Sequence, residues 1–274
     1  MNLEQRAKNI RYNILDMIAT SGSGHIGGSL SAVELMTVLY FEVLKHQPNK
    51  PDWEGRDRVI FSKGHASALL YACLVEAGYF DEKELKTFRK IDSLLQGHPT
   101  RNGLAGVEVS TGSLGMGLSV GVGMALAFKQ QKMNNRVYVL IGDGECQSGQ
   151  IWEAAMAAAH YKLNNLCVIL DYNGLQIDGS NAEVMSLGDL YLKWDSFEWN
   201  VIKVLDGHNI SNIIDAYNEA NKRTEPTIII ADTIKGKGIS FMENKAEWHG
   251  KVPTEKLLEK AYEELWIGLI KNNG

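Results

Sequence analysis

The sequence has few cysteines and no arrangement of them that indicates a metal or disulfide site. The chain of 274 residues contains three, at Cys73, Cys146 and Cys167, far apart and odd in number. This pattern excludes a disulfide framework and lacks the ligand spacing of a zinc site. It indicates a reducing, cytoplasmic setting.

Long apolar runs and an excess of basic residues are also missing. No hydrophobic stretch approaches the ~20 residues that a membrane-spanning helix needs. The first ten residues, MNLEQRAKNI, are polar and lack the core of a signal peptide. The formal net charge is −5, and the basic residues are dispersed. We therefore expect a protein that binds neither membranes nor nucleic acid.

The first half of the chain has helical periodicity. Apolar residues recur at helical spacing over 3–20, and "SAVE" at 31–34 has the capping-box pattern that predicts a helix reaching about Leu44. Residues 64–79 predict an apolar helix and 81–90 a solvated one. The glycine-rich segment 111–130 predicts a buried helix.

From Arg136 the pattern changes to short apolar runs rich in β-branched residues. Four strands are expected, at 137–141, 166–170, 200–205 and 227–232. Between or before them lie helical segments at 148–161, 181–194 and 210–222, and a last helix is expected near 253–270. Alternation of buried strands with helices predicts an α/β fold, with a mostly parallel central sheet covered on both faces. We expect residues 1–274 to form one domain.

An aspartate between two glycines follows the first of these strands. In "IGDGECQSGQ", Asp143 stands where a parallel sheet binds ligands, ahead of a helix expected near Ser148 whose N-terminus favours anions. A carboxylate beside an anion requires a cation between them, and Mg²⁺ suits that position. The plainer alternative is a turn residue or a helix cap.

A second polar residue lies thirty positions further on, at the end of the next strand. Asn173, in "DYNGLQIDG", is expected to converge with Asp143. The pair resembles the thiamine diphosphate motif, Gly-Asp-Gly followed about thirty residues later by Asn. The resemblance implies a thiamine diphosphate-binding fold and a Mg²⁺ ion (or Ca²⁺ or Mn²⁺). The metal ligands would be the Asp143 and Asn173 side chains and the backbone carbonyl of Leu175.

The resemblance extends over residues 10 to 250. "SGHIGGSLSAVEL", "FSKGHASALLYA", "GHPT", "VEVSTGSLGMGLSVGVGMA", "DTIKGKGIS" and "WHG" look like the N-terminal half of transketolase, in that order. Membership would imply transfer of a two-carbon ketol unit from a ketose or ketose phosphate to an aldose or aldose phosphate.

The resemblance also implies roles for individual residues. His65 would bind the cofactor diphosphate and Lys235 would neutralise it, and Lys63 is a further candidate contact. His25, His98 and His249 would line the sugar channel, bind hydroxyls and assist proton transfer, because histidine titrates near neutrality. The remaining cofactor contacts would be Gly112, Ser113, Leu114, Gly144 and His249. His46, His160 and His208 are expected to be structural or surface residues.

Two positions depart from the family pattern. Ser148 replaces a glutamate of an acidic network that links the two active sites of the dimer, whereas Glu153 keeps a second acidic position. Gly28 replaces a serine that touches the diphosphate in some relatives. We expect Ser148 to alter coupling between sites but not metal binding.

Part of the machinery of a transketolase is not expected in this chain. The glutamate that activates the cofactor, and the arginines that bind the substrate anion, belong to the pyrimidine-binding and C-terminal domains. The hypothesis is therefore the N-terminal, diphosphate-binding subunit of a split transketolase. A separate C-terminal subunit would supply those groups, in an assembly with two copies of each chain (A2B2).

Three alternatives remain open at this point. The Gly-Asp-Gly and Asn pair would also serve a 2-oxoacid dehydrogenase or a deoxyxylulose-phosphate synthase, although "WHG" favours transketolase. A short-chain nicotinamide dehydrogenase is suggested by "TGSLGMG". However, its glycine spacing is one residue short, and Tyr79–Lys83 precedes the glycines. A non-catalytic cofactor-binding scaffold is the third.

Overall fold

The centre of the protein is a five-stranded parallel sheet. The structure, a computed structural model, describes residues 1–270. The strand order is β1-β2-β3-β7-β6, and every neighbouring pair is parallel. The strands are β1 (Arg58–Phe61), β2 (Val137–Gly142), β3 (Leu166–Tyr172), β6 (Asn200–Val204) and β7 (Thr227–Asp232). The predicted α/β class and four of these strands are confirmed.

The edge strand β1 was not predicted from the sequence. "RVIF" has only four residues and lies in the half of the chain that has helical periodicity. Its partner is β2, with Arg58 opposite Val137. A strand this short is stabilised by pairing with a distant segment, so no local pattern reveals it.

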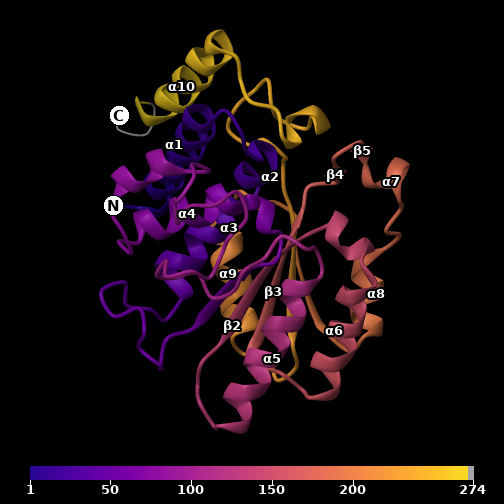
Figure 1. Ribbon diagram of the computed structural model, residues 1–274. Helices are drawn as coiled ribbons and strands as arrows, with labels where there is room; N and C mark the ends of the chain where they lie inside the picture. The colour runs from indigo at the N-terminus through magenta and orange to yellow at the C-terminus, as the bar shows by residue number, and fades with distance from the viewer. Residues whose placement is uncertain (271–274) are drawn as a thin grey trace.

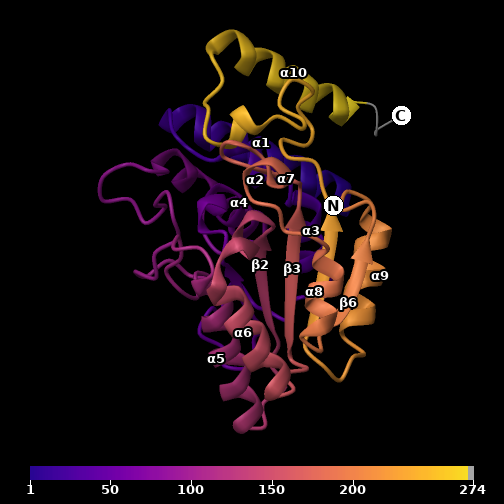
Figure 2. The ribbon, with the colours of Figure 1, turned by 90° about the vertical axis from the view of Figure 1, so that its right-hand side faces the viewer.

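Helices cover both faces of the sheet, as predicted, because successive strand residues point to opposite sides. Tyr138 and Leu140 pack into one core with α1 (Leu3–Ser21), α3 (Val33–Val38), α4 (Ser67–Glu76) and α9 (Ile210–Ala220). Val139 and Ile141 pack into the other, with α5 (Met116–Gln130), α6 (Gly149–His160) and α8 (Leu190–Ser196). Figure 2 shows α6 and α8 in front of the strands.

Several helical predictions need correction. The segment 181–194 is split into α7 (Asn181–Val184) and α8, and 81–90 contains only a 3₁₀ turn at Glu82–Thr87. The predicted capping box at Ser31 is wrong: α3 begins at Val33, and the Ser31 hydroxyl donates to Asp171 instead. A true capping box joins Ser180 and Glu183.

The remaining elements are short, apart from the last helix. They are α2 (Ile26–Leu30), a π-helical turn (Leu39–Val43), 3₁₀ turns at Gly64–Ala66, Gly144–Gln147 and Ala246–His249, and the hairpin β4 (Leu175–Gln176) with β5 (Gly179–Ser180). The helix α10 (Glu255–Ile270) agrees with the prediction of a last helix near 253–270. None of the helices within residues 1–270 has the length and hydrophobicity to cross a membrane.

The parallel strands bring distant segments to one edge of the sheet. Their carboxyl ends point toward the end of the molecule where α2, α7 and α10 lie (Figure 1). In the ladder, Gly142 pairs with Asp171, and Asp171 with Ala231. The chain segments that follow β1, β2, β3 and β7 therefore leave the sheet at the same level, which is where ligands bind in such folds.

Candidate active site

A pocket of about 280 Å³ lies at the carboxyl edge of the sheet. Most residues predicted to bind cofactor or substrate line it, from segments spread over the whole chain. These are His25, His65, Gly112, Leu114, Asp143, Gly144, Asn173, Leu175, Lys235 and His249. Two predicted residues do not line it, Ser113 and His98. Both are exposed, and the His98 ring lies beside Gly112 with its centroid 6.0 Å from that of His25.

Asp143 is a buried carboxylate held by backbone amides. Its side chain is 3% exposed, and its two oxygens accept hydrogen bonds from Gly144 N (2.7 Å) and Gly174 N (2.6 Å). Burial, and then the nearby charge of Asp171, raise the pKa of Asp143 to about 6. An anion buried with only amide partners is costly. A cation bound at its oxygens would offset that cost.

Asn173 lies on the neighbouring turn, and hydrogen bonds to Asp171 and to the backbone of Leu175 orient its side chain. Its amide nitrogen points toward Asp171 (Nδ2 to Oδ2, 3.3 Å), and its Oδ1 accepts from Leu175 N at 3.1 Å. The turn continues through Gly174, whose φ of +74° favours glycine. Since Gly174 N also reaches Asp143, the two turns are joined directly.

The oxygen atoms of these turns fit a hard divalent cation. A carboxylate, an amide oxygen and a backbone carbonyl on Leu175 are the kinds of donor that Mg²⁺ takes, together with ligand phosphates. Within residues 1–270, no three His, Cys, Asp or Glu side chains gather as a metal site. A metal at Asp143 would therefore need the asparagine, the backbone and oxygens of a bound ligand.

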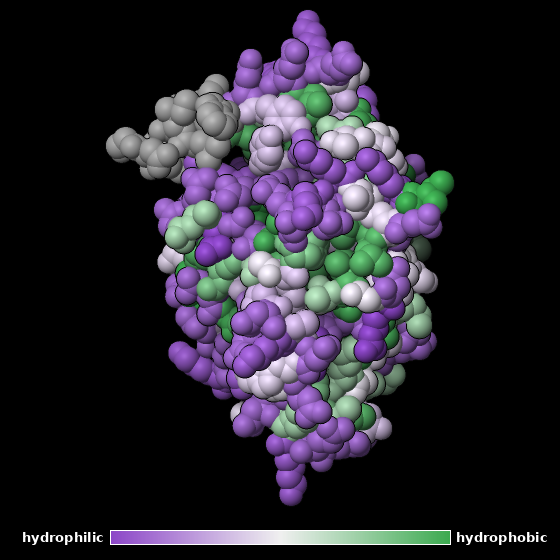
Figure 3. Space-filling model, turned by 60° about the vertical axis from the view of Figure 1, so that its left-hand side comes forward, coloured by the Kyte–Doolittle hydropathy of each residue, from purple (hydrophilic) through white to green (hydrophobic). Residues whose placement is uncertain are grey.

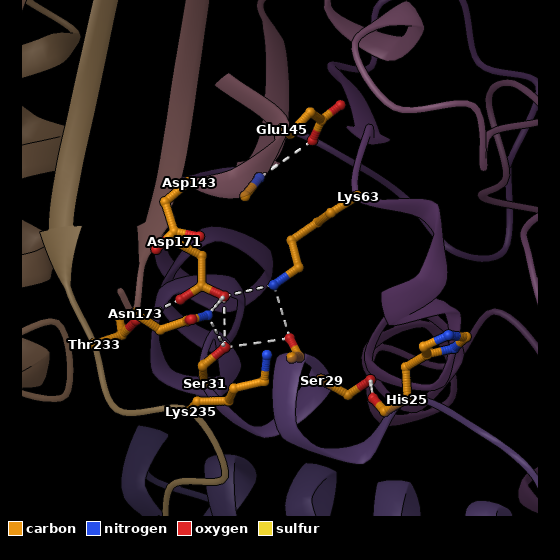
Figure 4. Close-up of polar contacts among 12 residues, drawn as sticks. His25, Ser29, Ser31, Lys63, Asp143, Glu145, Asp171, Asn173, Thr233 and Lys235 are labelled. Carbon is orange, nitrogen blue, oxygen red and sulfur yellow. Dashed lines mark hydrogen bonds and ion pairs between the residues drawn. The ribbon is translucent and has the colours of Figure 1, made fainter. Parts of the chain in front are cut away.

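Asp171 is the centre of the buried network in Figure 4. It is fully buried and pairs with Lys63 Nζ at 2.5 Å, while Ser31 Oγ donates to it at 2.5 Å and Thr233 Oγ1 donates as well. Burial alone would raise the pKa of Asp171, but the Lys63 ammonium and these donors hold it below its usual value. Because Asp171 also bonds Asn173, it sets the position of a predicted metal ligand and of a pocket lysine together.

Two lysines make the same pocket favourable for an anion. Lys63 and Lys235 are 2% and 1% exposed, and Lys235 Nζ lies 3.1 Å from Leu175 O. Burial, and then the charge of Lys63, lower the pKa of Lys235 to about 8. A bound diphosphate would relieve this repulsion. The helix α6 begins at Gly149, as expected, but Ser148 does not line the pocket, so the lysines supply the positive charge instead of a helix N-terminus.

Glu145 joins three loops of the pocket and was not singled out in the sequence. It is 2% exposed, and its carboxylate accepts from Gly115 N (2.7 Å), Gly142 N (3.2 Å) and the Ser62 hydroxyl. Burial raises its pKa. With three donors on it, Glu145 fixes the shape of the pocket and has little capacity left to contact a ligand.

Four histidines form a compact cluster beside the lysines. The ring centroids of His25 lie 5.3 Å from both His65 and His249, and those two are also 5.3 Å apart. Burial is the largest cause that lowers their pKa values, to about 4 for His25, 2 for His65 and 3 for His249. Nearby cations lower them further. The imidazoles are therefore neutral at pH 7.

This cluster predicts acid lability in the absence of a cofactor. Between pH 6.5 and the lowered values, the unfolded chain binds more protons than the folded one, so stability falls as the pH falls below 6.5. Each of these histidines can contribute up to about 1.4 kcal/mol per pH unit. We expect His65→Gln to reduce the pH dependence of the unfolding free energy between pH 7 and 5, measured by denaturant titration.

Comparing the wild type with His65→Gln separates the contribution of His65 to the pH dependence from that of Asp143, which has the opposite sign. Asp143, with its raised pKa, acts in the other direction below pH 6, but its contribution cancels between the wild type and His65→Gln. His160→Gln is the matched control because His160 is exposed at the end of α6. Equal pH slopes for the wild type and His65→Gln would contradict the neutral cluster.

The other three histidines lie outside the pocket, as expected. His46 bonds the Tyr40 carbonyl and the Tyr79 hydroxyl, at 2.9 and 3.1 Å. His208 lies between Glu34 (2.9 Å) and the backbone N–H of Ile234 (2.9 Å), next to Lys235 in sequence. His208 is therefore structural, and it supports the loop that carries Lys235.

The sequence alone contains little indication of four residues that shape the site. Lys63 was only a further candidate, and three were not predicted: Asp171, Glu145 and Arg89. Asp171 and Glu145 each lie two residues from a recognised motif residue, which is a usable signal. Lys63 follows a strand that was not predicted. Arg89 is in a loop whose sequence gives no indication that it approaches His25.

Comparison with known proteins agrees with this geometry. Residues 3–265 match the family described as "Transketolase, thiamine diphosphate binding domain". The chain is 42% identical to one of the subunits of apulose-4-phosphate transketolase from Phocaeicola vulgatus, over 96% of this chain and 93% of that protein. It is also 42% identical to the SqwG subunit of 6-deoxy-6-sulfo-D-fructose transketolase from Clostridium sp., over 97% and 96%. The solved transketolase of Campylobacter jejuni superimposes with a TM-score of 0.91 at 34% identity, covering 97% of this chain and 43% of that one.

Proposed function

This chain belongs to the transketolase family of transferases, and we propose that it is the diphosphate-binding subunit of a two-chain transketolase. The reaction would move a two-carbon ketol unit from a ketose to an aldose. One observation carries the proposal. The Asp143 and Asn173 turns leave adjacent strands side by side, and they line the same pocket as two buried lysines.

We propose that thiamine diphosphate binds with its diphosphate and a magnesium ion at the sheet edge. Asp143, Asn173 and the Leu175 carbonyl would hold the metal. Lys235 and His65 would contact the phosphate oxygens, with Lys63 behind them in its ion pair with Asp171. The segment Gly112–Leu114 would face the rings of the cofactor, at the rim of the pocket.

The histidines would handle the sugar. The cofactor, when bound, supplies the electron sink for breaking a carbon–carbon bond next to a carbonyl. His25, His249 and His98 would orient the substrate oxygens and hold or pass protons at them, since neutral imidazole both donates and accepts. Partial burial of His25 and His249 would keep these two rings neutral.

The rim of the pocket supports the proposal of a separate partner chain. Leu114, Met116 and Ile177 are 42%, 49% and 66% exposed, which is unusual for large apolar residues beside a polar site. Two further residues, Gly123 in α5 and Met156 in α6, are also exposed. Apolar residues are also exposed across the middle of the face in Figure 3, which is the side that lies to the left in Figure 1.

We propose that the partner carries the pyrimidine-binding and C-terminal domains, and that residues 1–274 act as one domain. An assembly with two copies of each chain would complete two sites. Ser148 precedes the first residue of α6 and lies against Gly115, since a Cβ on Gly115 would come within 2.6 Å of the Ser148 hydroxyl. A glutamate at this position would need room beside Gly115, so we expect coupling between sites to differ here.

We propose phosphorylated ketoses and aldoses as substrates. The names of the two relatives specify a sugar phosphate and a sulfonated sugar, both of which carry an anionic end.

We also propose a cytoplasmic setting, which suits three cysteines that are buried free thiols.

The direct test is cofactor binding, measured by calorimetry on the assembled protein. We expect thiamine diphosphate to bind when Mg²⁺ is present and to lose at least about tenfold in affinity when the metal is chelated, because Asp143 and the phosphates then repel each other. Thiamine without the diphosphate is the control and should bind far more weakly. Equal binding of the two compounds would refute the assignment of this pocket.

A further inference from the structure

Arg89 lies in a loop that returns to the pocket after the 3₁₀ turn Glu82–Thr87. Its φ of +59° is uncommon for a residue with a side chain. The guanidinium packs against Gly97, where an added Cβ would lie 2.7 Å from Arg89 Cζ. The loop backbone is fixed by Arg89 N donating to Leu95 O at 2.8 Å. The loop backbone at Arg89 is therefore held in place.

The guanidinium of Arg89 lies against the ring of His25. Arg89 donates through one terminal nitrogen to Ser23 Oγ (2.8 Å), and its other terminal nitrogen lies 3.2 Å from His25 Nδ1. Its Nε is buried without a hydrogen-bond partner. None of the ion pairs found within residues 1–270 joins Arg89 to a carboxylate, so its charge is not neutralised by one.

The contact between Arg89 and His25 permits one protonation state of the histidine. A guanidinium has only donors, so His25 Nδ1 must offer a lone pair. A neutral imidazole with a free Nδ1 carries its proton on Nε2. We propose that Arg89 is a positioning residue that holds His25 as the neutral tautomer protonated at Nε2.

The surroundings of His25 support this assignment. The charged or titratable groups that face it are Arg89, His98, Lys235, Lys63, His65 and His249. All are cationic or imidazole, and no carboxylate is among them to favour a proton on Nδ1. His249 has a parallel arrangement, since Lys235 Nζ lies 3.1 Å from its Nδ1.

Fixing this tautomer determines what His25 can do in the proposed reaction. With Nδ1 engaged by Arg89, the ring presents an Nε2–H on its other side. It therefore acts on the sugar as a hydrogen-bond donor to a carbonyl or hydroxyl oxygen, and not as the initial base. This consequence rests on the proposed function, whereas the tautomer itself does not.

The tautomer can be measured by ¹⁵N NMR of the full chain with labelled histidine. We expect His25 in the wild type to show an unprotonated Nδ1 and a protonated Nε2 at pH 7. Replacing the donor, in Arg89→Met, is expected to move the averaged Nδ1 signal toward the protonated position and to raise the pH at which His25 titrates. Arg89→Lys, which keeps a donor, should restore most of the wild-type signal. Arg101→Met is the matched control because Arg101 is exposed.

Kinetics of the two-chain enzyme give a second measurement. Loss of an oriented donor is expected to lower kcat for ketol transfer in Arg89→Met roughly 10- to 100-fold, with cofactor affinity unchanged. Two results would overturn the proposal. One is a wild-type His25 that carries its proton on Nδ1, and the other is the same titration of His25 in the wild type and in Arg89→Met. If the wild-type pair transfers no ketol unit, the proposed function fails, while the NMR result still tests the tautomer.

Discussion

Ketol transfer by this chain alone is expected to be about 10²- to 10⁴-fold slower than by the chain together with a C-terminal transketolase chain from the same organism. That range is the usual contribution of a positioned acid–base group. Two acids line the pocket in the described part of the chain, Asp143 and Glu145. We assign the first to the metal, and three donors occupy the second.

The acid behind the pocket is also engaged. Asp171 pairs with Lys63 and is fully buried, so it has no path to a cofactor ring. On the two-chain proposal, the carboxylate that activates the cofactor would therefore come from the partner. The exposed Leu114 and Ile177 at the rim indicate where another chain would cover the site.

The measurement is a coupled assay with a ketose phosphate donor and an aldose phosphate acceptor. The chain is tested alone, the partner alone, and the two are combined at increasing ratios. The rate should be about 10²- to 10⁴-fold higher in the mixture than with this chain alone, and it should saturate at equal amounts of the two chains. Turnover by this chain alone at the rate of the mixture would eliminate the two-chain proposal.

Substitution of Asp143 by asparagine is expected to abolish cofactor binding while leaving the fold intact. Changes to residues that merely orient a metal ligand typically cost 10- to 100-fold in affinity or activity. Loss of the ligand itself should cost more, on the order of 10³-fold in thiamine diphosphate affinity and in ketol transfer. The reason is that Glu145, the other carboxylate that lines the pocket, is already held by three donors.

The stability of this variant provides the control. In the protein without cofactor, burial penalises the Asp143 carboxylate at neutral pH, as its pKa of about 6 shows. A neutral amide removes that penalty but leaves one of the two backbone donors, Gly144 N or Gly174 N, without an acceptor, so the two effects oppose each other. The melting temperature of Asp143→Asn should therefore stay close to that of the wild type without cofactor. Asp178→Asn, in the exposed turn between β4 and β5, is the matched substitution. Undiminished Mg²⁺-dependent binding by Asp143→Asn would rule out the metal assignment.

The fold class followed from local pattern, and its errors have local causes. Four strands had enough β-branched residues in a row to be recognised, but "RVIF" in β1 did not. Ser31 has the spacing of a capping residue, yet its hydroxyl bonds Asp171. A fully buried carboxylate needs several donors besides Lys63, and a missing one costs at least as much as a lost cap.

The sequence by itself determined the α/β class, the Gly-Asp-Gly and Asn pair, and the family. Those features depend on residue type and short spacing, which a single chain records directly. Only the tertiary structure decided how the site is supported. Lys63 and Asp171 are 108 residues apart, Arg89 and His25 are 64 apart, and Ser62 and Glu145 are 83 apart. Contacts at such separations are selected by the packing of strands and loops at the sheet edge, and by the cost of burying a polar group without a hydrogen-bond partner.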